Sequence, residues 1–403
     1  MVVCSSESPE SVESVGLPCG VEPAPGRFHH GLSMLSTPVS GVCRGCRSGV
    51  GRLSARPWNL SLTARSTTIG ETMRASFSLP VPVATGIAPP DLTDSTLLDA
   101  DPDAQMSLGT VAVDSRSDVT YATVELPDGA RRELKLDVLR PAGDDRLPLV
   151  VYLPGGAFLR CTKAMAFEAR RHVAESGFVV ASVEYRVAPD GATFYDSVRD
   201  VRAALAYLRS HADDFGIDPR AVALWGESAG GHLAALTAVT DGLPEFSDAL
   251  ETAPQGQVRA VIDAYGSSEL SAIADDFDEA ARVYYQREAT HFSAYLGRPG
   301  APFPEIPDAV RAADPATHAT ASAPPFLFLH GSEDMLVSPS QTQHVHRALR
   351  AAGADSTRYV LKGANHGDVA FLGGPSTGLP WTSATTMGVI TEFLHRRLDA
   401  TGR

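Results

Sequence analysis

Residues 221–232 have the sequence AVALWGESAGGH, and this stretch predicts a strand, a sharp turn and a helix in succession. The residues before Gly226 are apolar, as in a short buried strand, and those after Gly230 suit a helix. Between them the pattern G-x-S-x-G places Ser228 on a strained strand-to-helix turn. Side chains two residues away would crowd such a turn, so glycine is needed on both sides. We therefore expect Ser228 to be a nucleophile rather than an ordinary helix-capping serine.

A serine hydroxyl is a weak nucleophile until a base takes its proton, so a histidine should accompany Ser228. His366 lies in the sequence GANHG at 363–367, directly after a predicted strand at 357–361. The glycines around it suit a loop that presents one imidazole ring, and we expect His366 to be the general base. The competing histidines are expected in other roles: His330 as structural, His344 and His346 as solvated helix residues, and His232 as packing beneath the site.

The base needs an acceptor that holds its tautomer. Asp334 ends the sequence HGSED at 330–334, just after a predicted strand at 325–330, where an orienting acid would lie. Glu333 is the rival for this role, and Asp368 is a weaker one. A turn-forming role for Asp334 is the alternative interpretation.

Acyl transfer also needs amide donors aimed at the oxyanion of its tetrahedral intermediate. Ala229, the residue after the predicted nucleophile, should supply one of them. The loop PGGAF at 154–158, which follows a predicted strand at 147–153, should supply the others. Its glycines permit close approach of a substrate, although a tight loop without a catalytic role would have the same composition.

Strands and helices alternate through most of the chain, which predicts an α/β fold with a mostly parallel, doubly wound sheet. Segments 119–125 and 132–139, joined by the turn PDG at 127–129, predict an antiparallel hairpin that opens the sheet. Residues 266–323 do not continue the alternation of strands and helices and are rich in acidic and aromatic residues. We therefore interpret them as a cap insertion. Their aromatic side chains either line an acyl or alcohol pocket or form the core of the cap.

The predicted organisation has three parts. Residues 1–75 are rich in Ser, Gly, Pro and Arg without helical or strand periodicity, so a disordered tail is expected. Residues 76–118 are interpreted as a linker or partial cap, and 119–403 as the catalytic domain. Met73 stands at the edge of the tail, and a translation start near it is a hypothesis that intact-mass measurement of native protein would test.

Charge and hydropathy narrow the classes of partner. The formal net charge of -14 argues against nucleic acid and against an anionic membrane surface. No apolar run approaches the roughly 18 residues that a membrane span needs, and the first residues resemble no secretory signal. We expect no membrane span and a cytoplasmic location.

The cysteines are unevenly distributed. Cys161 alone lies in the predicted body, which therefore does not depend on disulfides, as expected in a reducing cytoplasm. The remaining four lie in the tail: Cys4, Cys19, Cys43 and Cys46. Cys43 and Cys46 have the spacing of half a zinc site, but no second close pair of ligands follows them. We expect neither a metal nor an organic cofactor.

Several segments together resemble the α/β-hydrolase superfamily, in particular the hormone-sensitive-lipase-like and bacterial feruloyl-esterase-like carboxylesterases. The similar segments span about residues 119–400 and read LDV at 136–138, LPGGAF at 153–158, EYRVAP at 184–189, GESAGG at 226–231, HGSED at 330–334 and NHG at 365–367. The order of serine, aspartate and histidine also matches that of the superfamily. The resemblance implies the α/β-hydrolase fold and an ester-hydrolysing activity.

Two positions depart from the family pattern. The family's oxyanion loop usually reads His-Gly-Gly-Gly and an aromatic residue, so by position Pro154 replaces the histidine and Ala157 the last glycine. The resemblance then implies that the amides of Gly156, Ala157 and Ala229 form the oxyanion hole. Pro154 lacks a side-chain hydrogen-bonding group that commonly braces this loop, which puts its rigidity in doubt. Glu184 stands where the family has aspartate, a change we expect to be structural.

These features predict a serine esterase that cleaves small to medium carboxylic esters through an acyl-serine intermediate. Arylformamide, lactone or short-peptide hydrolysis would use the same residues, and an acceptor alcohol could replace water. A non-catalytic ligand-binding protein on a hydrolase scaffold is the alternative from another class, favoured only by Pro154. The expected partner is a small-molecule ester. The sequence decides neither the acyl length nor whether the protein is a homodimer.

Overall fold

This computed structural model describes residues 62–63, 76–77, 84–101, 103–247, 258–287, 290–367 and 380–399. Most of the expected disordered tail lies outside them, as do Cys43, Cys46 and Asp368. Near the end of the expected tail, β1 (Leu62–Thr63) pairs antiparallel with β2 (Ser76–Phe77), which opens the segment expected as a linker or partial cap. The pairing of Leu62–Thr63 departs from the structureless tail expected there.

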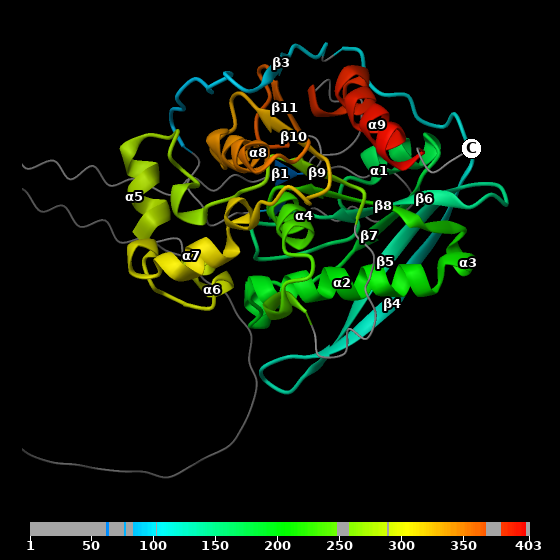
Figure 1. Ribbon diagram of the computed structural model, residues 1–403, viewed down its shortest axis with the longest axis horizontal. Coiled ribbons are helices and arrows are strands. Elements are labelled where there is room, and N and C mark those ends of the chain that lie inside the picture. Colours follow the sequence, from blue (N-terminus) through cyan, green and yellow to red (C-terminus); the bar gives the residue numbers. More distant parts are fainter. Residues whose placement is uncertain are drawn as a thin grey trace, which may run out of the picture. The chain divides into compact units, whose positions relative to one another are not determined.

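A nine-stranded mixed sheet organises the described body (Figure 1). Its strands are β3 (Thr96–Leu98), β4 (Val113–Glu125), β5 (Arg131–Pro141), β6 (Leu147–Leu153), β7 (Val179–Val183), β8 (Ile217–Glu227), β9 (Ala260–Ala264), β10 (Phe326–Gly331) and β11 (Ser356–Leu361). They lie in the order β3-β11-β10-β9-β8-β6-β7-β5-β4. The β4–β5 hairpin is antiparallel, β5 pairs antiparallel with β7, and the pairs from β7 to β3 are parallel. The predicted mostly parallel sheet opened by a hairpin is confirmed.

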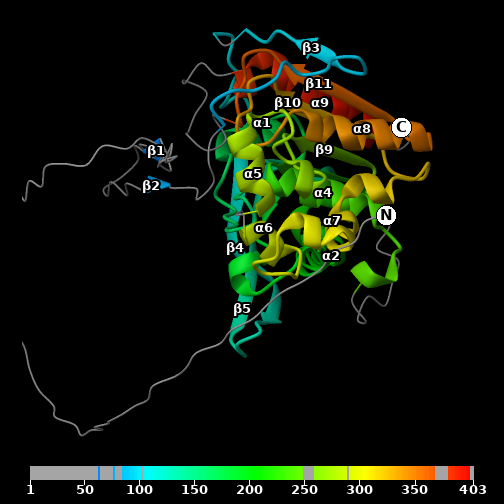
Figure 2. The ribbon, with the colours of Figure 1, turned by 90° about the vertical axis from the view of Figure 1, so that its left-hand side faces the viewer.

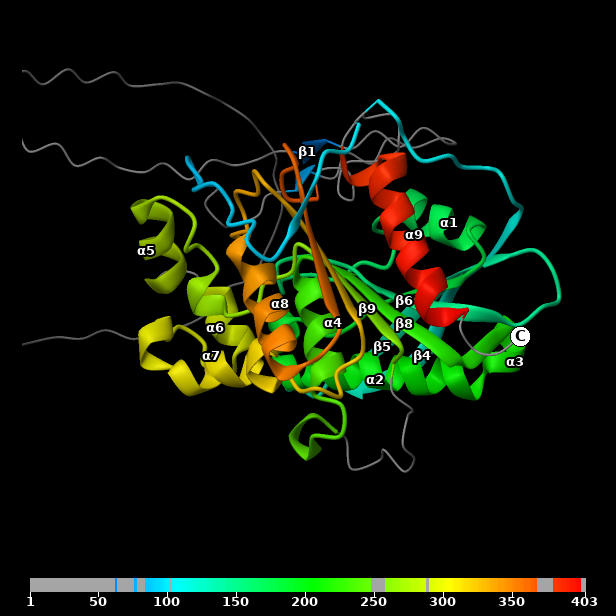
Figure 3. The same ribbon diagram turned by 45° about the horizontal axis from the view of Figure 1, so that its top comes forward.

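Helices cover both faces of this sheet, because its central strands are apolar on both sides. Along β6, Leu149 and Val151 face one hydrophobic layer, whereas Val150 and Tyr152 face the other. The first layer is closed by α2 (Phe194–Ser210), α4 (Ala229–Val239) and α8 (Ser340–Ala352). The second is closed by α1 (Phe167–Glu175) and α9 (Ala384–Leu398), which lie together in Figure 3. The short α3 (Ala212–Phe215) leads into β8.

The interruption expected at 266–323 corresponds to the connection between β9 and β10. It contains α5 (Glu279–Arg287), α6 (Thr290–Tyr295) and α7 (Pro307–Ala313), which Figure 2 shows grouped beside the sheet. Tyr285, Phe292 and Tyr295 are buried in the main hydrophobic layer. Of the two roles left open for these aromatic residues, their burial favours core packing.

The segment before β4 is more ordered than a linker. Residues 84–112, which we call the strap, contain β3, and this strand pairs in parallel with β11 at the sheet edge. Ile87 forms an isolated bridge with Phe277, and Gln105 forms one with Ser383. β4 begins at Val113, six residues before the expected start of the ordered body. The linker interpretation of this part of 76–118 is therefore wrong, because strap backbone groups pair with distant elements.

Membrane insertion through a helix finds no support here. In the part of the chain that the structure describes, no helix combines the length and the apolar composition that a membrane span requires.

Candidate active site

Ser228 occupies a strained turn between β8 and α4. Its φ of 55° and ψ of -122° lie outside the conformations that residues with a Cβ normally adopt. A Cβ added at Gly226 would lie 2.0 Å from the carbonyl oxygen of Gly230, and one at Gly230 would lie 2.0 Å from that of Leu153. Both glycines of the motif are therefore required sterically, and the amide of Ser228 is held by the carbonyl of Ala264 at 2.9 Å.

The predicted base and acid meet this serine in one line of hydrogen bonds. His366 Nε2 lies 2.8 Å from Ser228 Oγ, and His366 Nδ1 lies 2.7 Å from Asp334 Oδ2. The three side chains follow the carboxyl ends of β8, β10 and β11, which meet at one edge of a parallel sheet. Asp334 is fully buried, whereas Ser228 and His366 keep a small exposed area. The structure thus brings together all three residues that the sequence singled out.

Asp334 is held as a carboxylate by four donors. Its Oδ1 accepts the amides of Leu336 and Val337, each at 2.9 Å, and Oδ2 faces His366 and, at 3.2 Å, His330 Nε2. Burial opposes ionisation, but the attraction of His366 and the hydrogen bonds from both histidines outweigh it. They hold the pKa of Asp334 well below its usual range. Glu333, the rival acid, is exposed.

The loop that carries His366 is fixed from two directions. Asn365 Oδ1 accepts the amide of His366 at 2.7 Å, and the Asn365 carbonyl accepts Trp381 Nε1–H at 2.8 Å. The ring of Tyr265 packs edge-on against His366 at 4.8 Å and against Trp381 at 4.5 Å. Sequence reasoning missed Tyr265 and Trp381, because neither belongs to a motif and both reach the site only through the fold.

The other histidines take up structural positions. His330 is buried and lies 2.9 Å from Thr342 Oγ1, as the structural role predicted, but it also contacts Asp334. His344 is exposed, whereas His346 is 1% exposed and bonds Ser356 Oγ and the Asp94 carbonyl. The prediction of a solvated His346 is wrong, because the strap covers that part of α8. His232 packs beneath Phe158.

The proposed oxyanion loop has an unusual backbone. Gly156, Ala157 and Phe158 have φ values of 151°, 54° and 59°, and a Cβ at Gly156 would lie 2.0 Å from the Arg160 carbonyl oxygen. In the described part of the chain, no acceptor takes a hydrogen bond from the amides of Gly156, Ala157 or Ala229. Gly156 and Ala229 are buried and Ala157 is partly buried. Amides at such positions without an acceptor are rare, so these three can donate to an oxyanion.

The brace that Pro154 cannot supply comes from another residue. The hydroxyl of buried Tyr185 donates to the Pro154 carbonyl, and the amide of Ala188 donates to that of Phe158 at 2.9 Å. The ring of Phe158 also stacks on Tyr295 at 4.1 Å. Tyr185, in the EYRVAP segment, therefore braces the oxyanion loop in place of the missing side chain.

Glu227, directly before Ser228, is a buried acid beneath the site. Its Oε2 accepts the hydroxyl of Tyr152 at 2.8 Å. Burial raises the pKa of Glu227 to about 7, although hydrogen bonds from Tyr152 and Tyr265 and the charge of Arg170 partly oppose this rise. The ring of Tyr152 also lies under the guanidinium of Arg170, at 5.6 Å.

The raised pKa of Glu227 predicts a pH-dependent stability difference. A carboxyl whose folded pKa exceeds its ordinary 4.5 destabilises the fold only when ionised, so the cost is absent below about pH 4.5 and complete above about pH 7. Replacing Glu227 by Gln removes this ionisation. We expect the free energy of unfolding of Glu227→Gln, relative to wild type, to rise between these limits by up to about 3 kcal/mol. Urea titrations across this range measure it, and parallel pH curves would contradict it.

Two further features, a group of acidic and histidine side chains and a cavity, lie outside the proposed triad. Glu269, Asp314 and His344 have ligand-type atoms within 4.8 Å of one another, but Asp314 already bonds Ser268 Oγ at 2.6 Å and His344 at 3.1 Å. We interpret the group as an ion pair with its polar neighbours rather than as a metal centre.

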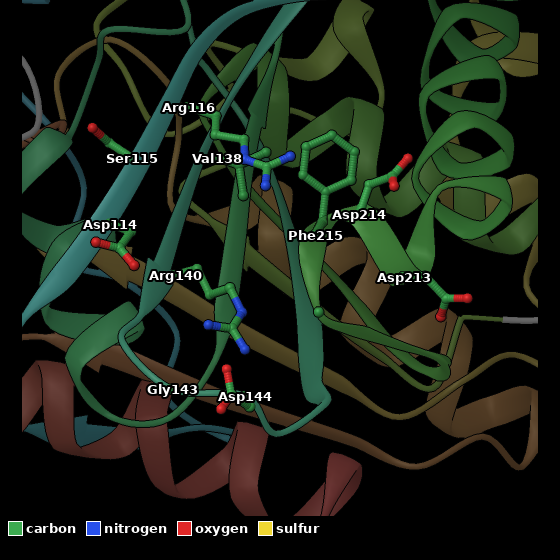
Figure 4. A pocket seen from close by; sticks show the side chains of 11 residues that line it. Asp114, Ser115, Arg116, Val138, Arg140, Gly143, Asp144, Asp213, Asp214 and Phe215 are labelled. Atoms are coloured by element: carbon green, nitrogen blue, oxygen red, sulfur yellow. The ribbon is translucent and has the colours of Figure 1, made fainter.

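A cavity of about 560 Å³ lies beside the start of β8, and Figure 4 shows its lining side chains. It is lined by aspartates and by Arg140 and Arg116, whose guanidinium lies 5.4 Å from the Phe215 ring centre. Gly216 lines this cavity and precedes β8, whereas Ser228 follows β8. β8 therefore lies between the cavity and the nucleophile. Because the residues from Ile217 to Gly226 pair with only seven residues of β6, that distance is roughly 20 Å.

Comparisons with known proteins agree with this geometry. Esterase LipC of Mycobacterium tuberculosis is 33% identical over 258 residues, covering 62% of this chain and 59% of that protein. The isoprenylcysteine alpha-carbonyl methylesterase ICME of Arabidopsis thaliana is 30% identical over 246 residues, covering 60% of this chain and 56% of that protein. The chain therefore spans little more than half the length of these curated relatives.

A solved structure and a family model extend the comparison. Esterase Est2 of Thermogutta terrifontis, with propionate bound, has a TM-score of 0.53 at 26% identity, covering 73% of this chain and 97% of that one. The family model described as BD-FAE matches residues 136–349, from β5 to α8. The match covers more than half of the chain, so this protein, with its α/β-hydrolase fold, belongs to the BD-FAE family.

Proposed function

We propose that this protein is a serine carboxylesterase that hydrolyses small to medium carboxylic esters. The observation that carries the proposal is the hydrogen-bonded line from Ser228 through His366 to Asp334. The names of the relatives support it, since both describe ester-cleaving proteins, and so does the propionate in the Est2 structure, a short carboxylate.

Acylation follows from this geometry. Ser228 Oγ attacks the ester carbonyl carbon while His366 Nε2 takes the hydroxyl proton. The carbonyl oxygen becomes an oxyanion, for which the amides of Gly156, Ala157 and Ala229 are the donors. His366 then gives its proton to the leaving alkoxide, so the ester C–O bond breaks, an alcohol departs and an acyl-serine remains. Asp334 stabilises the imidazolium without taking its proton.

Deacylation repeats the same steps with water. His366 takes a proton from water as the hydroxide attacks the acyl carbon, and it returns that proton to Ser228 Oγ as the carboxylic acid leaves. No step requires a group beyond these side chains and amides. Amide, formamide and lactone carbonyls could enter the same site, and substrate comparison separates these reactions.

The test compares matched substrates on the full-length protein. We expect p-nitrophenyl esters of graded acyl length to be turned over, with a maximum at one length, and the matched p-nitroanilides to be turned over far more slowly. A fluorophosphonate should add its phosphonyl group to Ser228, as seen by peptide mass. Faster turnover of an anilide, arylformamide or lactone than of the p-nitrophenyl esters would show that the protein cleaves that bond instead. Absence of both turnover and labelling would leave a ligand-binding protein as the better interpretation.

A further inference from the structure

The strap runs past the two loops that complete the proposed triad. In Figure 1 this segment, coloured blue to cyan, passes from beside α5 along α8 and β11 to α9. It precedes the 136–349 segment matched by the family model. Three of its contacts reach the segments that carry or support Asp334 and His366, ending at Met335, Lys362 and Thr382. The strap itself contributes no side chain to the line of hydrogen bonds.

The first contact is at the acid loop. The amide of Ala84, a buried residue, donates to the carbonyl of Met335 at 3.1 Å. Met335 directly follows Asp334, and its own amide donates to Asn365 Oδ1 at 3.3 Å. The same Asn365 oxygen accepts the amide of His366. Ala84 is therefore bonded to the residue that joins the acid loop to the histidine loop.

The second contact is at the strand that leads to the histidine. Strap residues 96–98 pair with residues 359–361 of β11. The ladder continues where the amide of Lys362 donates to the carbonyl of Leu98 at 3.0 Å. Lys362 lies four residues before His366, so the strap holds the backbone at the start of the loop that carries His366.

The third contact reaches the histidine loop from the other side. The amide of Met106 donates to the Thr382 carbonyl at 2.9 Å, and Thr382 Oγ1 donates to Gln105 Oε1 at 2.5 Å. Thr382 follows Trp381, whose indole N–H holds the Asn365 carbonyl. Strap residues thereby anchor the short helix η7 (Pro380–Thr382) that supports Asn365.

We propose that the strap is a positioning element that sets the relative placement of the Asp334 and His366 loops. The inference rests on the proposed function, because it concerns how that triad is aligned. The physical reason is that proton transfer between Ser228 and His366 depends steeply on their separation, and a misplacement of about 1 Å can cost about 10²-fold in rate. Loops tied at both ends to a shared segment lose the freedom to drift apart.

The experiment removes single strap contacts from the full-length protein. Ala84→Pro deletes the amide that bonds Met335, and Ala88→Pro is its matched control. The Ala88 amide also donates to a carbonyl outside the strap, that of Asp276 at 2.8 Å. Asp276 bonds Ser338 and Ser340 at the start of α8, but neither Met335 nor the histidine loop. A second pair is Gln105→Ala against Gln343→Ala, since Gln343 Nε2 ties α8 to the Asp91 carbonyl at 2.9 Å. This pair serves if the proline variants do not fold.

We expect Ala84→Pro and Gln105→Ala to lower kcat for a p-nitrophenyl ester by about 10-fold or more, with KM nearly unchanged. Each control should retain kcat within about 2-fold at a similar Tm. The acid limb of the pH–kcat profile should also shift in the test variants only, because it reports the environment of His366. Equal loss in test and control variants, or no loss in either, would overturn the positioning role.

A measurement without substrate separates this inference from the proposed function. The low-field proton resonance of the His366 Nδ1–H bonded to Asp334 reports the alignment of the two loops even if no ester is turned over. We expect that resonance to shift or broaden in Ala84→Pro and Gln105→Ala, and to be unchanged in the two controls. An unchanged resonance in both test variants would overturn the inference, whereas loss of wild-type turnover alone would count only against the esterase assignment.

Discussion

Replacing Ser228 by alanine is expected to lower kcat for p-nitrophenyl acetate by at least about 10⁴-fold. The hydroxyl supplies the bond-forming atom, and it lies 2.8 Å from His366 Nε2, the atom that takes its proton. The fold should survive, since the backbone at φ 55° is held by its neighbours and alanine keeps the amide that bonds Ala264. Stopped-flow release of p-nitrophenol and a thermal melt measure both expectations.

The matching variant His366→Ala makes the test sharper. Serine and histidine act as one unit, so each single variant should lose about as much activity as the double variant. Additive losses would show that the two residues do not act together. Ser210→Ala is the control, because Ser210 is exposed on α2 and its hydroxyl bonds only local groups, the carbonyl of Tyr207 and the ring of His211. If Ser228→Ala kept more than about 1% of the activity, another nucleophile would have to be sought.

Replacing Asp334 by asparagine should lower kcat by about 10³- to 10⁴-fold with little change in size at the site. An amide has one oxygen, and Asp334 uses both of its oxygens as acceptors. If the NH₂ group faces His366, the imidazole must carry its proton on Nε2 and cannot take one from Ser228. If the NH₂ group faces the amides of Leu336 and Val337, donors meet donors and the loop is destabilised.

Glu333→Gln is the matched control for that variant, because Glu333 adjoins Asp334 in sequence and was its rival for the role. Glu333 is exposed, and we expect its substitution to change kcat by less than about 2-fold. Rates for both variants should be followed from pH 6 to pH 9 with one ester. Equal losses in the two variants, or a loss confined to Glu333→Gln, would contradict the assignment of Asp334.

Local patterns made most of the fold predictable. The hairpin turn at 127–129, the apolar runs of β6 and β8 and the helical spacing of α2 each depend on residues close in sequence. The order of the strap was not predicted, because it depends on residues far apart in sequence. β3 has three residues, and its strand character comes from pairing with β11 more than 250 positions away. No periodicity can be detected in so short a segment.

The sequence also did not predict which residues contact the charged and polar side chains around the site. His330 was expected to be structural, yet its contact with Asp334 arises from the turn that follows β10. His346 was expected to be solvated, but strap residues bury it. These outcomes depend on which distant segment covers a given side chain, and the helical pattern of α8 carries no information about that cover.

The sequence by itself determined the nucleophile turn, the chemical types of the three aligned side chains and their order along the chain. It could do so because a G-x-S-x-G turn is a local steric solution, and because parallel strands bring their carboxyl-end loops to one edge. Only the tertiary structure decided that Tyr185 braces the oxyanion loop, that Glu227 is buried enough for its pKa to rise to about 7, and that the strap joins the acid and histidine loops. Burial and long-range hydrogen bonding are properties of the packed chain, and no single segment contains them.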